Sequence, residues 1–251
     1  MKDHVLKRLV NGTFFPVGSV RTILLGPCRG MQIRLSHASG HAVLTGYDRL
    51  AQRSLVTHVR RGSTVFDVGA NCGQYTLLLA RLVGADGRVV ACEPVASIFA
   101  ELVGNVDLNG LSWVHCESAA VAGAEGSVRF LSSPDEPTMG KIDGADPAIH
   151  VASYMADLVR ATTIDALSQQ WGSPEVVKID TEGAAGEVLA GARNTALHAR
   201  PAFLIEVHGP VERTAVQAWA GCSGYTVSDL TGAPVEDLAD RHVSPVWLKA
   251  A

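Results

Sequence analysis

The sequence TVFDVGANCGQ, at residues 64–74, decides the fold. Its apolar run at 64–68 predicts a short buried β-strand, and the residues at 75–83 predict a helix. Gly69 and Gly73 lie between the two, where a residue without a Cβ atom lets the backbone turn tightly. A strand, a glycine turn and a helix in this order are typical of the first unit of a parallel α/β sheet.

Strands and helices go on alternating through the rest of the chain. Near-continuous apolar strands between helices indicate a parallel sheet that is covered on both faces. The last two strands are close in sequence, which favours an antiparallel pair at the edge of the sheet. The expected strands after the first are 88–92, 113–116, 119–121, 127–131, 176–180, 202–207, 225–229 and 245–249, and the expected helices are 96–108, 184–199 and 212–220.

The residues before the first strand predict a small extension rather than a second large domain. Short strands at 20–25, 31–35 and 42–45 are separated by glycine breaks, and a helix follows them. We therefore divide the chain into an N-terminal β-rich and helical extension, residues 1–60, and a main α/β domain, residues 61–251.

One segment of the main domain, residues 132–160, shows no sustained periodicity. It contains Pro134, Pro137 and Pro147 and two turns rich in aspartate. A loop of this length inside a compact domain is usually functional. We interpret it as an insertion that serves as a lid over an acceptor molecule.

The composition fits a globular chain and excludes some classes of partner. Hydrophobic residues make up 47% of the 251 residues, which is enough for a full core. The formal net charge is −4, so neither nucleic acid nor an anionic membrane surface is an expected partner. No stretch approaches the ~20 apolar residues that cross a bilayer, so no membrane span is expected. A small or neutral acceptor fits better.

The cysteines favour a reducing compartment. There are five, an odd number, and they lie far apart without a C-x-x-C pair, which argues against a disulfide framework and a zinc site. The first residues also lack the apolar run of a signal peptide. The expected location is the cytoplasm. The oligomeric state is open, with a homodimer through the N-terminal strands among the alternatives.

The glycine turn and the end of the next strand predict a site for a nucleoside. Open α/β sheets bind ligands at the carboxyl ends of their strands, and Glu93 lies where an acidic side chain accepts hydrogen bonds from both ribose hydroxyls. Asn71 and Gln74 stand where the second and third glycines of G-x-G-x-x-G would be, so S-adenosylmethionine (SAM) is favoured over NAD. Asp67 is expected to hold the charged methionine end of SAM. The residues expected to bind SAM are Asp67, Gly69, Asn71, Gly73, Gln74, Tyr75, Glu93, Pro94, Ser118 and Asp180.

The second half of the chain carries a more distinctive pattern. Residues 176–183 read VVKIDTEG and residues 201–208 read PAFLIEVH. Together with VFDVGAN at 65–71 and ATTIDAL at 161–167, they closely resemble the FkbM family of methyltransferases over about residues 46–208. The resemblance implies a class I SAM-dependent methyltransferase fold, with a Rossmann-like, mostly parallel sheet of seven strands and an antiparallel edge strand. It also implies O-methylation of a hydroxyl on a sugar, polyketide or similar metabolite.

Polar residues at two strand ends are the candidates for catalysis. An alcohol is a poor nucleophile at neutral pH, so a base or a metal ion must assist the transfer of a methyl group to it. His208 or Asp180 is the predicted base, although His208 could equally serve only to bond a strand end. Glu182 is the third catalytic candidate. Lys178 is expected to pair with a carboxylate such as Asp67 rather than to react.

A metal site is the alternative to a base. Asp180, Glu206 and His208 form a candidate set for Mg²⁺, which takes oxygen ligands and would acidify the acceptor hydroxyl. The concentration of polar residues near the expected methyl group favours a small hydroxylated acceptor, such as a saccharide or a secondary metabolite.

Three other functions compete with this interpretation. An NAD-dependent oxidoreductase is disfavoured by the missing glycine pattern. A nucleic-acid methyltransferase is disfavoured by the negative charge and by the lack of the Pro-Pro-aromatic tetrapeptide that accompanies base flipping. A non-catalytic SAM-binding module is disfavoured by the polar residues at the strand ends, which are all present.

Overall fold

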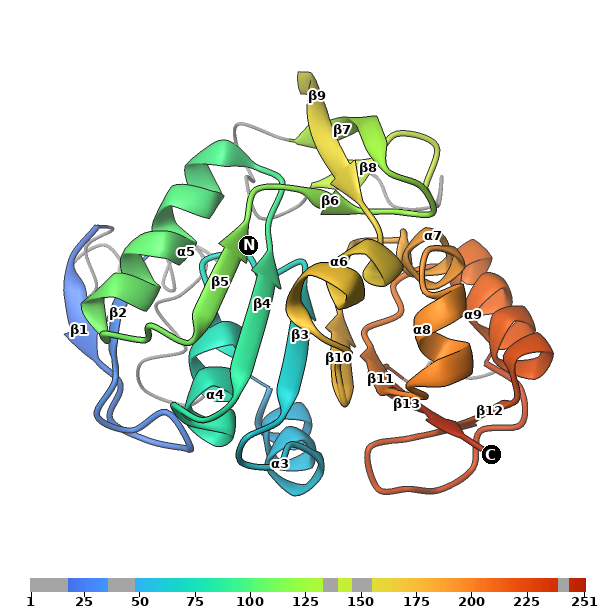
Figure 1. The fold of residues 1–251 in the computed structure, drawn as a ribbon, viewed down its shortest axis with the longest axis horizontal. Coiled ribbons are helices and arrows are strands. Elements are labelled where there is room, and N and C mark those ends of the chain that lie inside the picture. Colours follow the sequence, from blue (N-terminus) through green and yellow to red (C-terminus); the bar gives the residue numbers. More distant parts are fainter. Residues whose placement is uncertain (1–17, 36–47, 133–139, 146–154, 239–243) are drawn as a thin grey trace, which may run out of the picture.

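The computed structural model describes residues 18–35, 48–132, 140–145, 155–238 and 244–251. Its centre is a seven-stranded sheet with the order β12-β13-β11-β10-β3-β4-β5 (Figure 1). Its strands in chain order are β3 (Thr64–Val68), β4 (Arg88–Cys92), β5 (Val114–Glu117), β10 (Val176–Ile179), β11 (Ala202–Ile205), β12 (Tyr225–Ser228) and β13 (Val246–Ala250).

The sheet confirms the predicted Rossmann-like α/β class. Its strands β5, β4, β3, β10 and β11 pair in parallel, so their carboxyl ends lie along one edge of the sheet. The antiparallel strand is β13, which pairs with both β11 and β12 and so lies one position inside the edge. The order reverses between β3 and β10, and a ligand site is expected where the two carboxyl ends diverge.

Helices cover both faces of the sheet, each over its own hydrophobic core. On one face, Leu77 and Leu102 pack with the inward side chains of β3 and β4, and Ile33 and Leu55 of the N-terminal part join them. The helices on this face are α3 (Arg49–His58), α4 (Gln74–Val83) and α5 (Ala96–Leu108). The opposite face is covered by α6 (Ile164–Trp171), α7 (Ala185–Ala190), α8 (Arg193–His198) and α9 (Pro210–Ser223).

The helix expected at 184–199 is in fact two helices, α7 and α8. The chain breaks at Gly191, where a Cβ atom would lie 2.2 Å from the carbonyl oxygen of Ala122. The close approach of another backbone segment therefore requires glycine at this point and interrupts the helix. Helix α6 was not expected as a separate element, and the Thr163 hydroxyl caps it by accepting from the Ala166 N–H.

A second sheet of four strands stands over the carboxyl ends of the central strands (Figure 1). It has the order β6-β9-β7-β8, with β6 (Ala120–Val121), β7 (Gly126–Ser132), β8 (Lys141–Ile142) and β9 (Met155–Thr162). The expectation of a structureless segment at 132–160 is therefore wrong in part, since β8 and most of β9 lie within it. Residues 133–139 and 146–154 of the expected lid lie outside the described residues.

The N-terminal extension contributes a two-stranded hairpin, β1 (Val20–Thr22) and β2 (Gln32–Arg34). Asn105 of α5 and its C-cap Asn109 hold β2, since they accept from the backbone N–H groups of Arg34 and Gln32 at 2.7 and 2.8 Å. The strand expected at 42–45 lies outside the described residues. In the ranges that the structure describes, no helix has the length and apolar character needed to cross a membrane.

Candidate active site

The glycine turn after β3 brings the ends of the two central strands into contact. Gly69 has φ +73°, and a Cβ atom at this position would lie only 1.8 Å from the carbonyl oxygen of Asp180, just after β10. Gly73 has φ +92° and forms the N-cap of α4, against the side chain of Leu102. Both glycines are therefore required by the backbone, as the sequence pattern predicted.

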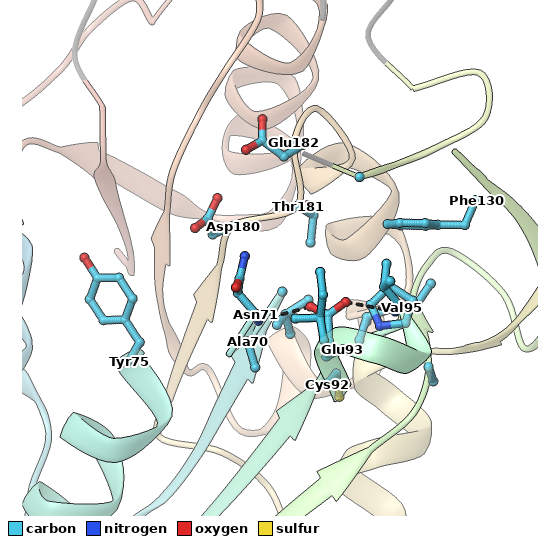
Figure 2. Close-up of a pocket in the computed structure, with 18 of the residues that line it drawn as sticks. Ala70, Asn71, Tyr75, Cys92, Glu93, Val95, Phe130, Asp180, Thr181 and Glu182 are labelled. Carbon is cyan, nitrogen blue, oxygen red and sulfur yellow. Dashed lines mark hydrogen bonds between the residues drawn. The ribbon is translucent and has the colours of Figure 1, made fainter. Parts of the chain in front are cut away.

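A cavity of about 240 Å³ opens at the carboxyl ends of β3, β4 and β10. Figure 2 shows Tyr75 and Asp180 on one side of it, Glu93 in the middle, and Val95 and Phe130 on the other side. The residues predicted from sequence that line this cavity are Gly69, Asn71, Gln74, Tyr75, Glu93, Pro94, Asp180 and Glu182.

Glu93 is fixed at the centre of the cavity by backbone donors. Its side-chain oxygens accept from the N–H groups of Asn71 and Val95 at 3.0 and 2.9 Å (Figure 2). Burial raises the pKa of Glu93 to about 7, against the lowering effect of these two hydrogen bonds. Each carboxylate oxygen has a second lone pair, so the group keeps acceptor capacity towards hydroxyl groups in the cavity.

Asp67 does not face the cavity. Its side chain is fully buried, where it accepts from the Thr76 hydroxyl at 2.7 Å and pairs with the Lys178 ammonium at 3.2 Å. The prediction that Lys178 pairs with Asp67 is confirmed. The prediction that Asp67 itself holds a ligand is not supported, because no part of the side chain reaches the cavity.

Lys178 connects this buried carboxylate to the cavity. Its ammonium lies 3.5 Å from an oxygen of Asp180, donates to the carbonyl oxygen of Gly69 at 3.1 Å, and lies 5.0 Å from the ring centre of Tyr75. Burial lowers the pKa of Lys178, but the charges of Asp67 and Asp180 raise it by more than burial lowers it. The pKa therefore lies above its usual value. The lysine is therefore a fixed positive charge and not a base.

Asp180, Glu182 and His208 form a cluster after the ends of β10 and β11. The Nε2 atom of His208 lies 3.0 Å from an oxygen of Asp180, and its Nδ1 atom lies 3.4 Å from an oxygen of Glu182. Burial lowers the pKa of His208, but the bond to Asp180 and the nearby carboxylates raise it to about 9. Burial raises the pKa of Asp180, and Lys178 and His208 lower it to below its usual value. At neutral pH the pair is an imidazolium and a carboxylate.

Glu206 lies at the edge of this cluster, directly after β11. Burial and the charge of Asp180 raise its pKa to about 7. Among the described residues, the group whose ligand atoms are close enough to hold a metal ion is Asp180, Glu182 and His208, all within 4.8 Å of one another. Glu206 is outside this group, so the metal set expected from sequence is not the one that the fold assembles. His208 and Glu206 stand behind the cavity lining rather than in it.

Glu212 was not expected in the site, but its carboxylate holds two backbone segments of the site in place. It is 2% exposed, and its two oxygens accept from the backbone N–H groups of Ala185 and His208 at 2.8 and 2.7 Å. The carboxylate thus joins the start of α7 to the segment after β11. In sequence, Glu212 is an ordinary acidic residue in the first turn of a helix, which carries no signal for this role.

Ser118, predicted to contact an adenine ring, is exposed and outside the cavity. The chain turns after β5, and the cavity is lined instead by the next three residues, Ala119, Ala120 and Val121. Other lining residues that the sequence did not single out are Val95, Ile98, Phe130, Gly140, Ile142 and Thr181. Most of these are apolar, and only the fold shows that they converge.

Known structures are similar to this chain at low sequence identity. An FkbM methyltransferase from Methylobacillus flagellatus is 18% identical, with a TM-score of 0.47, over 74% of this chain and 43% of that chain. A SAM-dependent O-methyltransferase from Thermotoga maritima is 12% identical, with a TM-score of 0.46, over 83% of this chain and 66% of that chain. Fibrillarin from Aeropyrum pernix, with natively bound SAM, is 11% identical, with a TM-score of 0.47, over 81% of this chain and 74% of that chain.

The chain spans less than half the length of the Methylobacillus protein. No curated protein matches its sequence. The match to a protein family is more direct, because residues 67–223, more than half of the chain, fit the methyltransferase FkbM domain. This range includes the glycine turn, Glu93, and the cluster around Asp180 and His208. The chain therefore belongs to the FkbM family of SAM-dependent methyltransferases.

Proposed function

We propose that this protein transfers the methyl group of SAM to a hydroxyl oxygen of a small molecule, with a saccharide or polyketide-type metabolite as the expected acceptor. The observation that carries the proposal is one cavity with Glu93 at its centre and with Asp180 and Glu182 at one end, where His208 bonds both of them from behind the lining. Glu93 suits the ribose of SAM, and the cluster suits an acceptor oxygen that must lose a proton.

The residues of the cavity fit SAM. Glu93 is held with free acceptor capacity towards the two ribose hydroxyls, and the turn at Gly69 lets the ligand approach the backbone closely. The carboxylate of Asp180 borders the same cavity, where it favours a positively charged sulfonium. SAM supplies an activated methyl group, so the chain has to align the acceptor and remove its proton.

His208 is the proposed base, and because it stands behind the cavity lining, the proton reaches it through Asp180, which lines the cavity and bonds its Nε2 atom at 3.0 Å. With a pKa of about 9, His208 carries a proton at neutral pH and must lose it before it can accept one from the acceptor. A positive charge beside Asp180 lowers the pKa of the imidazolium, because like charges repel. Binding of the cationic cofactor therefore favours the neutral form of His208, which can accept a proton. We expect turnover to rise with pH until His208 is neutral.

A metal ion is the second candidate for activation of the hydroxyl. The set within ligand distance is Asp180, Glu182 and His208, which could hold Mg²⁺ or another divalent ion. Lys178 and a protonated His208 already provide positive charge next to Asp180, which favours the metal-free mechanism. Turnover that survives exhaustive chelation supports the base, and turnover restored only by added Mg²⁺ supports the ion.

The first experiment is calorimetric titration with S-adenosylhomocysteine and with NAD, with and without Mg²⁺. We expect micromolar binding of S-adenosylhomocysteine, weakened in Glu93→Ala and unaffected by Mg²⁺. Binding of NAD instead, or of neither compound, contradicts the proposal. A positive result justifies a screen of hydroxylated metabolites with SAM that carries a radiolabelled methyl group. Methyl groups recovered on nitrogen or carbon would overturn the assignment to oxygen.

A further inference from the structure

The four-stranded sheet above the central strands reaches into the cavity. Phe130 of β7 and Ile142 of β8 face each other across the pairing of these strands, and both line the cavity. Gly140 lines it directly before β8. The sheet is therefore part of the site and not only a cover for the fold.

The position of the Phe130 ring depends on Gly140. A Cβ atom at Gly140 would lie 2.4 Å from Cε1 of the ring, so any larger residue displaces it. Phe130 is 8% exposed and lines the cavity. Gly140 thus leaves the space that the Phe130 ring occupies in the wall of the cavity.

The Phe130 ring lies at the end of the cavity opposite Asp180. Figure 2 shows Phe130 beside Val95, with Glu93 between this pair and the side where Tyr75 and Asp180 lie. Val95 at this end is uncharged, as are Ile98 and Ala119, which also line the cavity. The cavity thus changes from charged to apolar across Glu93.

We propose that Phe130 stacks on the adenine ring of the cofactor and that Gly140 is the residue that makes room for this contact. The inference rests on the proposed function: with ribose at Glu93 and the sulfonium near Asp180, the base extends to the apolar end. A flat π-system suits an aromatic wall opposite aliphatic side chains. This assigns the added sheet to the cofactor, whereas the sequence suggested a lid over the acceptor.

The test is calorimetric titration of S-adenosylhomocysteine and of free adenosine into four purified proteins: wild type, Phe130→Ala, Phe130→Leu and Gly140→Ala. Loss of base stacking weakens binding roughly tenfold in comparable sites, so we expect about this loss for both ligands in Phe130→Ala. Phe130→Leu keeps apolar volume without a flat face, and a smaller loss is expected. Gly140→Ala should weaken binding although Phe130 is still present, because its methyl group displaces the ring.

The matched control is Leu131→Ala. Leu131 is the next residue of β7, on the opposite face of the strand, and it does not line the cavity. It should leave both affinities unchanged. Tight binding by wild type with equal affinity in Phe130→Ala overturns this inference and leaves the proposed function intact. Absence of S-adenosylhomocysteine binding in wild type overturns both.

Discussion

Two parts of the site are built from different interactions. Where β3 and β4 end, the structure depends on backbone shape. Gly69 is in close contact with the backbone just after the adjacent strand β10, and Glu93 is held by two N–H groups. Where β10 and β11 end, it depends on charge, with Asp180 between Lys178 and His208. The first part is suited to hold one ligand in a fixed shape. The second is suited to change its protonation as the reaction requires.

This difference predicts which changes damage each part. Substitutions that add side-chain atoms should be most harmful at the glycine turn, where the new atoms would meet backbone atoms that cannot shift without strain. Changes of charge or pH should act mainly on the cluster around His208, whose groups titrate together. The predictions below test this separation, starting with the largest expected effect.

Gly69→Ala should be the most damaging substitution. The methyl group meets the Asp180 carbonyl oxygen at 1.8 Å, and φ +73° is unfavourable for alanine. Strain and overpacking together should cost about 4 kcal/mol, which lowers the melting temperature by roughly 12 °C and abolishes S-adenosylhomocysteine binding. Differential scanning calorimetry and titration measure the two effects. Gly221→Ala is the control, since its Cβ would meet nothing within 4 Å in α9 and alanine favours a helix. A Gly69→Ala protein as stable as wild type contradicts the steric account.

Glu212→Ala should destabilise the segments around the cluster with no change in the cavity lining. It leaves the buried N–H groups of Ala185 and His208 without their acceptor. We expect a loss of about 3 kcal/mol in the free energy of unfolding, measured by urea denaturation. Glu187→Ala is the control, because Glu187 is exposed on the same helix α7 and should change stability by less than about 0.5 kcal/mol. Equal losses in the two variants would show that Glu212 has no special role.

His208 should make stability depend on pH. Its folded-state pKa of about 9 is above the usual 6.5, so the folded protein holds this proton more tightly than the unfolded chain does. The stabilisation is complete below pH 6.5 and is lost as the pH rises through 9. We expect the difference in unfolding free energy between wild type and His208→Gln to shrink by about 3 kcal/mol between pH 6 and 10. Urea denaturation at several pH values measures it, and a difference that stays constant disproves the charge-based description.

The smallest effect should come from Glu182→Gln. Both Asp180 and Glu182 raise the pKa of His208, but Asp180 is the nearer partner, at 3.0 Å against 3.4 Å. Removing the charge of Glu182 should therefore lower this pKa less than Asp180→Asn does. Titration of the imidazole signals by nuclear magnetic resonance compares the two variants directly. The reverse order would mean that Glu182 is the main partner of the ring.

The sequence is informative where structure follows from local patterns. The strands at 64–68 and 88–92 and the helix at 96–108 have the bounds that their apolar runs predict. Strand β9 was missed because six of its eight residues are not buried, so burial left no alternating pattern to detect. It pairs with β7 across a long connection, which short-range signals do not encode.

The candidate site shows the same division. Glu93 and Asp180 stand out because acidic residues at strand ends are uncommon without a reason, and both line the cavity. Glu212 and Phe130 do not stand out, since one is typical of a helix start and the other of any strand. Their positions depend on how distant segments pack, and packing is decided by the whole chain. Ser118 is the converse case, a plausible polar residue that a turn directs to solvent.

The place of β13 has a consequence for how the protein is made. This strand lies between β11 and β12, although both of them precede it in the chain. As the protein leaves the ribosome, β11 and β12 are synthesised before the strand that joins them, and until it arrives β11 presents an unpaired edge. Trp247 of β13 also donates to the Ser54 hydroxyl and stacks on His58 of α3. Strand β13 thus completes the sheet and anchors a helix made much earlier, so this domain cannot finish folding before β13 has been synthesised.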